Sequence, residues 1–162
     1  MTTKHIKETL PLWGIQKRPL LMDGAMGSLI QEYKLTEEDF RGEMFRDWNV
    51  QLKGNNDVLA LTRPDIISAI HRRYIEAGAD IIITDTFSAQ RISQQEYLLS
   101  DYVEQINRAA VRIAREAADS FVPKEGDRRK KIFVLGDVGP TSRMLSMSDD
   151  VNDPAARSIT FD

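Results

Sequence analysis

Residues 81–85 of the chain are Ile-Ile-Ile-Thr-Asp, an uninterrupted apolar run that ends in a carboxylate. Two other stretches follow the same pattern: residues 20–23 are Leu-Leu-Met-Asp, and residues 132–137 are Ile-Phe-Val-Leu-Gly-Asp. A short apolar run without alternation is typical of a strand that is buried on both faces, as in a parallel sheet. We therefore predict three parallel strands whose polar carboxyl ends carry Asp23, Asp85 and Asp137.

Between these runs the apolar residues recur at helical spacing. The pattern from Pro64 to the residue before Gly78 predicts a helix over 64–77, because Pro is tolerated in a first helical turn and Gly commonly ends a helix. A second stripe with steps of three and four residues predicts a helix over 101–119. His71 falls on the side of the first helix away from its apolar stripe, which favours a solvent-exposed position over a metal-binding role.

Two shorter segments lie before the first long helix. Val58–Leu61 is apolar and bracketed by turn residues, so we interpret it as a fourth strand. Lys53–Asp57 has the composition of a tight turn with positive backbone angles, and its role as a ligand loop is the weaker alternative. A helix is also expected over Ser28–Tyr33.

Strands that alternate with helices indicate an α/β protein with a parallel sheet. An open doubly wound sheet and a (β/α)8 TIM barrel both fit, and both place ligands at the carboxyl ends of strands. A barrel takes about 250 residues, whereas this chain has 162 and three or four expected strands. We therefore expect an N-terminal arm at 1–19 and, over 20–162, the N-terminal part of a barrel that is incomplete in this chain.

Composition excludes several classes of function. Lys and Arg number 22 against 25 Asp and Glu, so the net charge is −3 and nucleic acid is not an expected partner. The sequence contains no apolar run long enough for a membrane span and no signal peptide, so we expect a cytoplasmic protein without a membrane partner. The chain has no Cys, which excludes disulfides, thiolate nucleophiles and Cys-ligated metal, and its histidines, His5 and His71, are far apart.

The turn after the first strand is the strongest candidate for a binding site. Residues 23–28 are Asp-Gly-Ala-Met-Gly-Ser, and Gly24 and Gly27 allow a ligand to approach the backbone closely. The N–H groups at the following helix start suit a carboxylate, and Asp23 suits an ammonium group. Together they would receive the zwitterion of an amino acid. The alternative is a tight strand-to-helix turn in which Asp23 caps the helix.

The other strand ends carry a rim of carboxyl and hydroxyl groups. Helix capping and turn chemistry are the alternative roles for these residues. Carboxylates that converge on one rim repel one another, so at least one must meet a cation, a hydrogen-bond donor or a proton. Arg91 and Arg143 are the candidate cations. The rim residues are Asp85, Thr86, Asp137 and Thr141.

The order and spacing of several motifs carry a resemblance to a known family. From about Leu20 to the last residue, the chain closely resembles the homocysteine-binding domain of cobalamin-dependent methionine synthases. The stretches at 53–57 and 150–154 favour methionine synthases over other homocysteine methyltransferases. The motifs are Asp23–Ser28, Leu52–Asp57, Glu76–Asp80, Thr84–Phe87, Gly139–Thr141 and Asp150–Pro154.

The resemblance implies a (β/α)8 barrel that binds homocysteine at its mouth. In that family a zinc ion held by three cysteines binds the substrate thiolate, and methylcobalamin, recharged by 5-methyltetrahydrofolate, supplies the methyl group. Asp23 would then hold the homocysteine ammonium, and the backbone of Gly24, Ala25 and Met26 would receive its carboxylate. The implied partners are the remaining barrel half and the cobalamin and folate modules. Because the cysteines lie in later strands of the family, the resemblance implies that this chain alone binds no zinc and is inactive.

The chain departs from the family pattern at two positions. Ser28 stands where Thr is usual, and Asp85 stands where methionine synthases commonly have Asn, which adds charge beside a site that must accept a carboxylate. No family role is carried onto Asp85 or Asp137. Two alternatives stay open: a non-catalytic half-barrel, and another α/β-barrel lyase that uses the acidic rim but would need a Lys or a metal at a strand end.

Overall fold

The structure, a computed structural model, describes residues 19–127, 129, 131–141, 143, 152–153 and 155. Most of the expected arm at 1–19 and of the 150–154 motif therefore lies outside the described residues. The helices and strands, in chain order, are α2 (Met26–Glu32), α3 (Glu37–Arg41), η2 (Asn56–Val58), α4 (Leu59–Thr62), α5 (Pro64–Ala77), β1 (Ile81–Ile83), α6 (Arg91–Gln94), η3 (Gln95–Tyr97), η4 (Ser100–Tyr102), α7 (Val103–Asp119) and β2 (Phe133–Leu135), where η denotes a 3-10 helix.

The sheet is small and parallel, as the sequence predicts. β1 pairs with β2 in the register that sets Ile81 opposite Phe133. On the other edge of β1, Met22 forms a parallel bridge with Ile81. The predicted first strand, 20–22, is thus reduced to a single bridge, because Leu21 pairs its N–H with the Asp80 side chain instead of a strand neighbour.

The helix predicted over 64–77 is α5, with the predicted bounds. Pro64 occupies its first turn, and Gly78 ends it with a φ of 112°, a left-handed conformation that a side chain would strain. The second predicted helix begins as the 3-10 turn η4 and continues as α7. α5 packs against α7 and β1, and α7 also contacts β2.

The strand predicted at Val58–Leu61 is wrong. These residues form the end of η2 and most of α4. Val58 and Leu59 are fully buried, and α4 packs against both α5 and α7. A short apolar run that is buried on all sides has no periodicity to separate a helix from a strand, so its packing partners decided the outcome.

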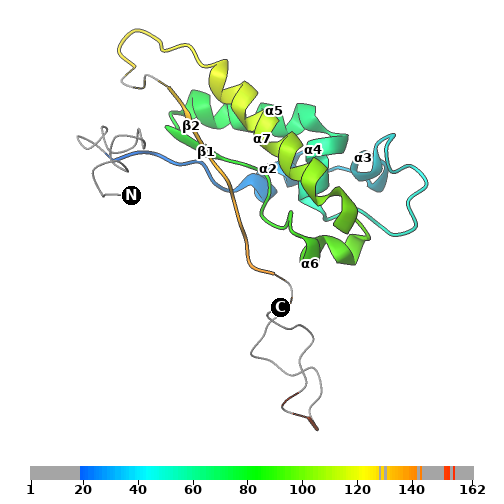
Figure 1. The fold of residues 1–162 in the computed structure, drawn as a ribbon. Coiled ribbons are helices and arrows are strands. Elements are labelled where there is room, and N and C mark those ends of the chain that lie inside the picture. The colour runs from blue at the N-terminus through cyan, green and yellow to red at the C-terminus, as the bar shows by residue number, and fades with distance from the viewer. Residues whose placement is uncertain are drawn as a thin grey trace.

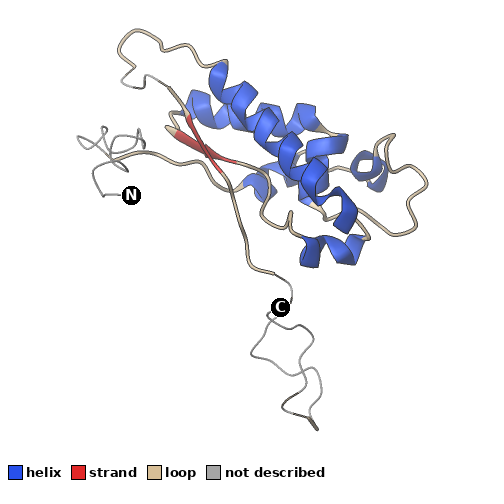
Figure 2. Cartoon of the chain, viewed as in Figure 1, coloured by secondary structure: helices blue, strands red, loops and turns tan. Residues whose placement is uncertain are grey.

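Helices cover one face of the sheet. Figures 1 and 2 show α5 and α7 side by side next to β1 and β2, with α2 at the end of the first segment. Ile82 and Val134 face these helices and belong to one apolar cluster with Ile75 and Ala114. None of the helices in the described part of the chain combines the length and apolar character that a membrane span requires.

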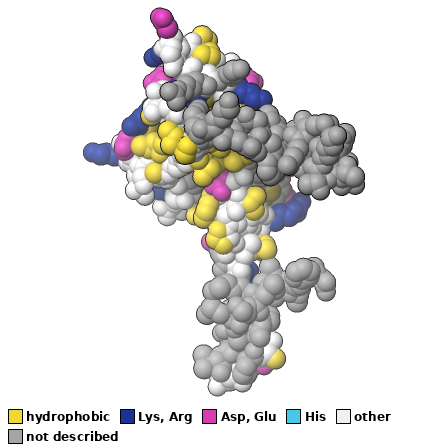
Figure 3. All heavy atoms as spheres, turned by 90° about the vertical axis from the view of Figure 1, so that its left-hand side faces the viewer, with side chains coloured by type: hydrophobic (Ala, Val, Ile, Leu, Met, Phe, Trp, Pro, Cys, Tyr) yellow, Lys and Arg dark blue, Asp and Glu magenta, His cyan; other side chains and the backbone are white. Residues whose placement is uncertain are grey.

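Apolar side chains remain exposed on the side of the molecule that carries the strands. Hydrophobic side chains gather there in Figure 3. Leu21 and Met22 expose 59% and 57% of their surface, and Leu135 exposes 37%. Among the described residues no further strand pairs with the outer edges of this sheet, and exposed apolar surface next to a strand edge favours association.

We expect the 162-residue chain to self-associate, and the double substitution Leu21→Gln with Met22→Gln to weaken the association because it removes apolar surface without breaking a main-chain bond. Sedimentation velocity over a range of concentrations measures this. Val111→Gln is the matched control, since Val111 is 45% exposed on α7. If the wild-type chain sediments as a single monomeric species and unfolds cooperatively, the exposed apolar face of the sheet does not drive self-association, and the prediction is wrong.

Candidate functional site

The carboxyl ends of three neighbouring parallel segments lie together. The N–H of Asp23 donates to the Ile81 carbonyl at 3.0 Å, and the N–H of Thr84 donates to the Leu135 carbonyl at 2.9 Å. These bonds continue the parallel pairing, so the acids that follow the three segments lie at one end of the sheet, as predicted. The acids are Asp23, Asp85 and Asp137.

A closed ring of hydrogen bonds joins the end of β1 to the end of β2. The Thr86 hydroxyl donates to the Asp137 carbonyl at 2.7 Å, and the Asp137 N–H donates to the Thr84 hydroxyl at 3.1 Å. Since a hydroxyl has one proton, the 2.7 Å contact between the two threonines must run from Thr84 to Thr86. Both threonines are buried. Thr86, a predicted rim residue, therefore holds Asp137 in place.

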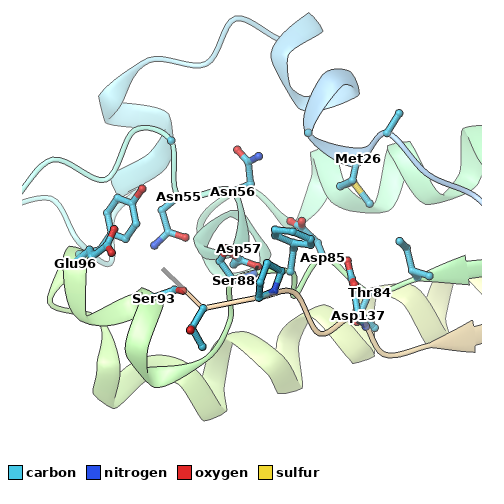
Figure 4. A pocket seen from close by; sticks show the side chains of 18 residues that line it. Met26, Asn55, Asn56, Asp57, Thr84, Asp85, Ser88, Ser93, Glu96 and Asp137 are labelled. Atoms are coloured by element: carbon cyan, nitrogen blue, oxygen red, sulfur yellow. Dashed lines mark hydrogen bonds between the residues drawn. The ribbon is translucent and has the colours of Figure 1, made fainter. Parts of the chain in front are cut away.

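A cavity of about 510 Å³ opens beside these strand ends (Figure 4). Its size is that of a typical small-molecule pocket. The predicted site residues that line it are Ala25, Met26, Asp85, Asp137 and Thr141. The predicted residues outside its wall are Asp23, Gly24 and Thr86. The Thr141 hydroxyl donates to the Arg143 carbonyl at 2.6 Å.

The described wall of the cavity is acidic. It contains four carboxyl side chains and no Lys or Arg, which disfavours a strongly anionic ligand unless backbone N–H groups receive its charge. Figure 4 shows acidic side chains on segments from different parts of the chain: η2, the end of β1, η3 and the segment after β2. The carboxyl groups belong to Asp57, Asp85, Glu96 and Asp137.

Burial shifts the ionisation of three acids in and beside this wall, Asp23, Asp57 and Asp85. It raises the pKa of Asp23 to about 6, although the Ile83 N–H donates to its Oδ1 at 3.0 Å. Burial likewise raises the pKa of Asp57 to about 6, against a 3.0 Å bond from the Ser88 N–H. For Asp85, burial and then the charges of its acidic neighbours raise the pKa well above the ordinary value. Its Oδ2 is buried and has no hydrogen-bond partner among the described residues.

Protons and backbone N–H groups thus relieve the repulsion that the sequence predicts. Arg91 does not: it is exposed on α6, and the ion pairs of the described residues do not join it to Asp23, Asp57 or Asp85. A carboxyl group kept neutral by burial needs no cation.

The sequence analysis did not identify the hydrogen-bonded pair of Asn55 and Gln94, of which Asn55 lines the cavity. Lys53–Asp57 does turn, with Gly54 at a φ of 104°, but Asn55 within it is buried and forms two hydrogen bonds with the buried Gln94, of 2.8 and 3.2 Å. Gln94 also donates to the Ser88 carbonyl at 3.1 Å. In the sequence, the amide and acid side chains of residues 55–57 hint that this turn has a further role. The partner of Asn55, Gln94, lies 39 residues away and becomes apparent only in the folded structure.

The turn after Asp23 is strained at Ala25. The sequence suggests that Gly24 supplies conformational freedom, yet the left-handed residue is Ala25, with a φ of 47°. Such a conformation costs an L-residue roughly 1–2 kcal/mol, and strain of this kind gathers at functional sites. Within the described part of the chain, the N–H groups of Gly24, Ala25 and Met26 enter no hydrogen bond.

The predicted solvent exposure of His71 is wrong. His71 is fully buried, because α5 is covered on more sides than its apolar stripe alone suggests. Its Nδ1 lies 4.0 Å from the Oδ2 of Asp23, and burial lowers its pKa to about 4. The imidazole is therefore neutral at physiological pH.

The residues present do not fit a zinc site of the kind that the resemblance implies. The chain has no Cys. No group of three His, Cys, Asp or Glu side chains that could hold a metal ion occurs among the residues that the structure describes. Zinc prefers thiolate and imidazole ligands, so no chemical step in these 162 residues is assigned to zinc.

A family sequence model and the solved structures with a similar fold both relate this chain to homocysteine methyltransferases. The sequence model of the homocysteine S-methyltransferase family matches residues 20–162. The fold is similar to that of the homocysteine methyltransferase MmuM from Escherichia coli in its metallated form, with a TM-score of 0.57 and 22% identity over 78% of this chain and 40% of that one. The structure of the oxidized form of MmuM gives the same TM-score and identity, and the match covers 78% of this chain and 39% of the MmuM chain.

The two comparisons carry different weight. At 22% identity the structural match shows a shared fold, and the chain spans about two fifths of the length of the structures that it matches. The family match begins at residue 20, where the first strand segment was predicted, and continues to the last residue. This chain belongs to the homocysteine S-methyltransferase family.

Proposed function

We propose that the chain carries the amino-acid-binding part of an enzyme that transfers a methyl group to the sulfur of homocysteine. Family membership over residues 20–162 supports the reaction class. The cavity at the strand ends supports a site for a small molecule. The observation that carries the proposal is the buried carboxyl of Asp23 directly before a turn whose N–H groups, from Gly24 to Met26, are unused among the described residues.

The turn offers one group for each charge of the substrate zwitterion. The N–H groups of Gly24, Ala25 and Met26 would receive the homocysteine carboxylate. The Asp23 carboxylate, which is buried just outside the cavity wall, would hold the ammonium once ligand binding makes it accessible. The described wall has no Lys or Arg, so an anion would be received by neutral donors, among which the backbone N–H groups of this turn are unused. The strain at Ala25 supports this assignment, since strained backbone of this kind is maintained by its surroundings and clusters at functional sites.

Asp85 would act in this site as a neutral acid. Burial and the charges of Asp57 and Asp137 favour its protonated form. A protonated carboxyl has one donor and remaining acceptor capacity, like the amide of Asn. Asp85 can therefore form a hydrogen bond to a polar group without placing a negative charge beside the substrate carboxylate. This accounts for an acid at a position where methionine synthases commonly have Asn. Asp137 and Thr141 complete the rim on the cavity wall.

We place the enzyme in the methionine synthase branch, on the motifs at 53–57 and 150–154. Methylcobalamin, recharged by 5-methyltetrahydrofolate, would then supply the methyl group, and the cobalamin and folate modules would be partners. Zinc would supply a polarised substrate thiolate. Its ligands would come from outside these 162 residues, so residues 1–162 are expected to be inactive by themselves.

The finer fold is also a proposal: the first part of a (β/α)8 barrel. Three parallel segments with helices on one face and apolar side chains exposed on the other support it. The second candidate function, a non-catalytic half-barrel, is favoured by one observation, the absence of Cys from the chain.

In the complete enzyme we expect Asp23→Asn to raise the dissociation constant of homocysteine about thirtyfold, or about 2 kcal/mol, because it removes the charge that faces the ammonium but keeps the size. Methyl transfer from folate to cobalamin should not change. Isothermal titration measures the affinity, with Asp101→Asn as the control at an exposed acid of η4. An unchanged affinity would leave Asp23 with a structural role alone.

Residues 1–162 should not retain zinc after dialysis, because the chain has no thiolate to hold it. Elemental analysis of the dialysed chain tests this. One equivalent of zinc per chain would contradict the proposal that the ligands lie elsewhere, and would direct attention to carboxylate and imidazole groups.

The acids at the strand ends should make stability fall as pH rises. Asp23 and Asp57, with pKa values raised to about 6, and Asp85, raised further above its ordinary value, keep protons in the folded state that the unfolded chain releases near pH 4. Their contribution is therefore greatest below pH 4 and is lost as pH rises through 6 and beyond.

We expect Asp85→Asn to be more stable than wild type at pH 7, and the difference in the free energy of unfolding to grow between pH 4 and pH 7, because only the wild type carries a carboxyl whose pKa burial raises. Urea unfolding at each pH measures it. The comparison with wild type removes the contributions of other acids, and Asp101→Asn is the control substitution at an exposed acid. A flat difference for Asp85→Asn would show that Asp85 is ionised in the folded protein.

A further inference from the structure

Most of the unsatisfied buried polarity in the described chain belongs to one pair of residues. Four buried side-chain polar atoms have no hydrogen-bond partner there, and three of them are Asp23 Oδ2, His71 Nδ1 and His71 Nε2. Leaving a buried polar group without a partner destabilises the folded state. Two such groups that face each other therefore call for a common explanation.

The geometry brings the two side chains almost into contact. The Asp23 side chain is 1% exposed and the His71 side chain 0%, and Nδ1 lies 4.0 Å from Oδ2. This is about 1 Å longer than a hydrogen bond, a gap that small rotations of the two side chains can close. Catalytic hydrogen bonds in unliganded sites are commonly long and tighten when ligand binds.

The protonation state fixes which atom donates. Burial lowers the pKa of His71 to about 4, so the ring is neutral and carries one N–H. With the proton on Nε2, the lone pair of Nδ1 would face a carboxylate oxygen, and a buried N–H would have no acceptor. With the proton on Nδ1, the donor faces Oδ2 and only an acceptor remains unused.

We propose that His71 is a positioning residue for Asp23: its neutral imidazole donates an Nδ1–H hydrogen bond to the Asp23 Oδ2. The Ile83 N–H already donates to the Oδ1 of the same carboxylate. α5 and β1 therefore hold the two oxygens from different elements, and the carboxylate cannot rotate between them. The value of this arrangement to the substrate rests on the proposed function, in which Asp23 meets the homocysteine ammonium.

The charged surroundings oppose ionisation of Asp23, which gives the donor its importance. Burial raises the pKa of Asp23, the Ile83 N–H lowers it, and the charge of Asp137, after β2, raises it. From α5, His71 is the titratable group that faces Asp23. A second donor stabilises the charged form that an ammonium ligand requires.

The tautomer of His71 can be measured directly in the wild-type chain. The sequence contains two histidines, His5 and His71, so the imidazole ¹⁵N spectrum has two sets of signals and His5→Gln assigns them. At pH 7 we expect His71 to be neutral with its proton on Nδ1. A proton on Nε2, or a charged ring, would overturn the proposal. Magic-angle-spinning spectra read the same shifts if the chain self-associates.

Two substitutions separate positioning from packing. The side-chain nitrogen of Asn replaces Nδ1 of a histidine, whereas that of Gln replaces Nε2. His71→Asn should leave the pKa of Asp23, followed by the ¹³C shift of its carboxyl, near the wild-type value. His71→Gln should raise that pKa by about one unit, since the ionised form loses a donor. Equal shifts in both variants would reduce His71 to a packing role.

Neither measurement needs homocysteine, so the outcome is independent of the proposed function. A proton on Nδ1 together with unchanged homocysteine affinity in Asp23→Asn would uphold the pair and remove Asp23 from the substrate site. A proton on Nε2 of His71 together with weakened homocysteine binding in Asp23→Asn would keep Asp23 as a substrate-binding residue and overturn the role proposed for His71.

Discussion

The bond from the Ile83 N–H to the Asp23 carboxylate is the interaction on which the site depends. The first strand segment meets β1 through a single bridge, at Met22, and through hydrogen bonds of Leu21 with Asp80 and Ile81. Asp23 adds a main-chain bond to Ile81 and a side-chain bond to Ile83. Because the carboxyl is buried, losing this bond would remove the hydrogen bond that it accepts in the described structure. The two bonds of Asp23 therefore fix the direction in which the backbone enters the turn at 24–25 and then α2.

The same rule, that a buried polar group must find a partner or lose its charge, organises the other segments around the cavity. Asp57 accepts the Ser88 N–H, and Asn55 pairs with Gln94, so the loop before α4 is tied to the segment after β1. Asp85 meets the requirement differently, because burial and acidic neighbours favour its neutral form. An acidic cavity is thereby built without any Lys or Arg in its described wall.

Some of this could be predicted from sequence because local physics decides it. Pro64 and Gly78 mark the ends of α5, and the apolar run at 81–83 becomes a strand between helices. The position of Asp85 at a strand end also follows, since the residue after a buried strand must lie at the edge of the sheet. The resemblance of residues 20–162 to one family agrees with the family match. The roles of Asp23 and the following turn stay predictions.

What the sequence determined by itself is the two long helices, the parallel strands around 81–83 and 133–135, and the end of the sheet where the acids gather, because periodicity and turn residues act over short distances. Tertiary structure decided the rest. Packing against α5 and α7 turned the apolar residues at 58–61 into a helix. Contacts 39 residues apart buried Asn55, and the approach of α5 to the first strand end buried His71 beside Asp23. Burial and pKa depend on neighbours distant in the chain, which no local pattern contains.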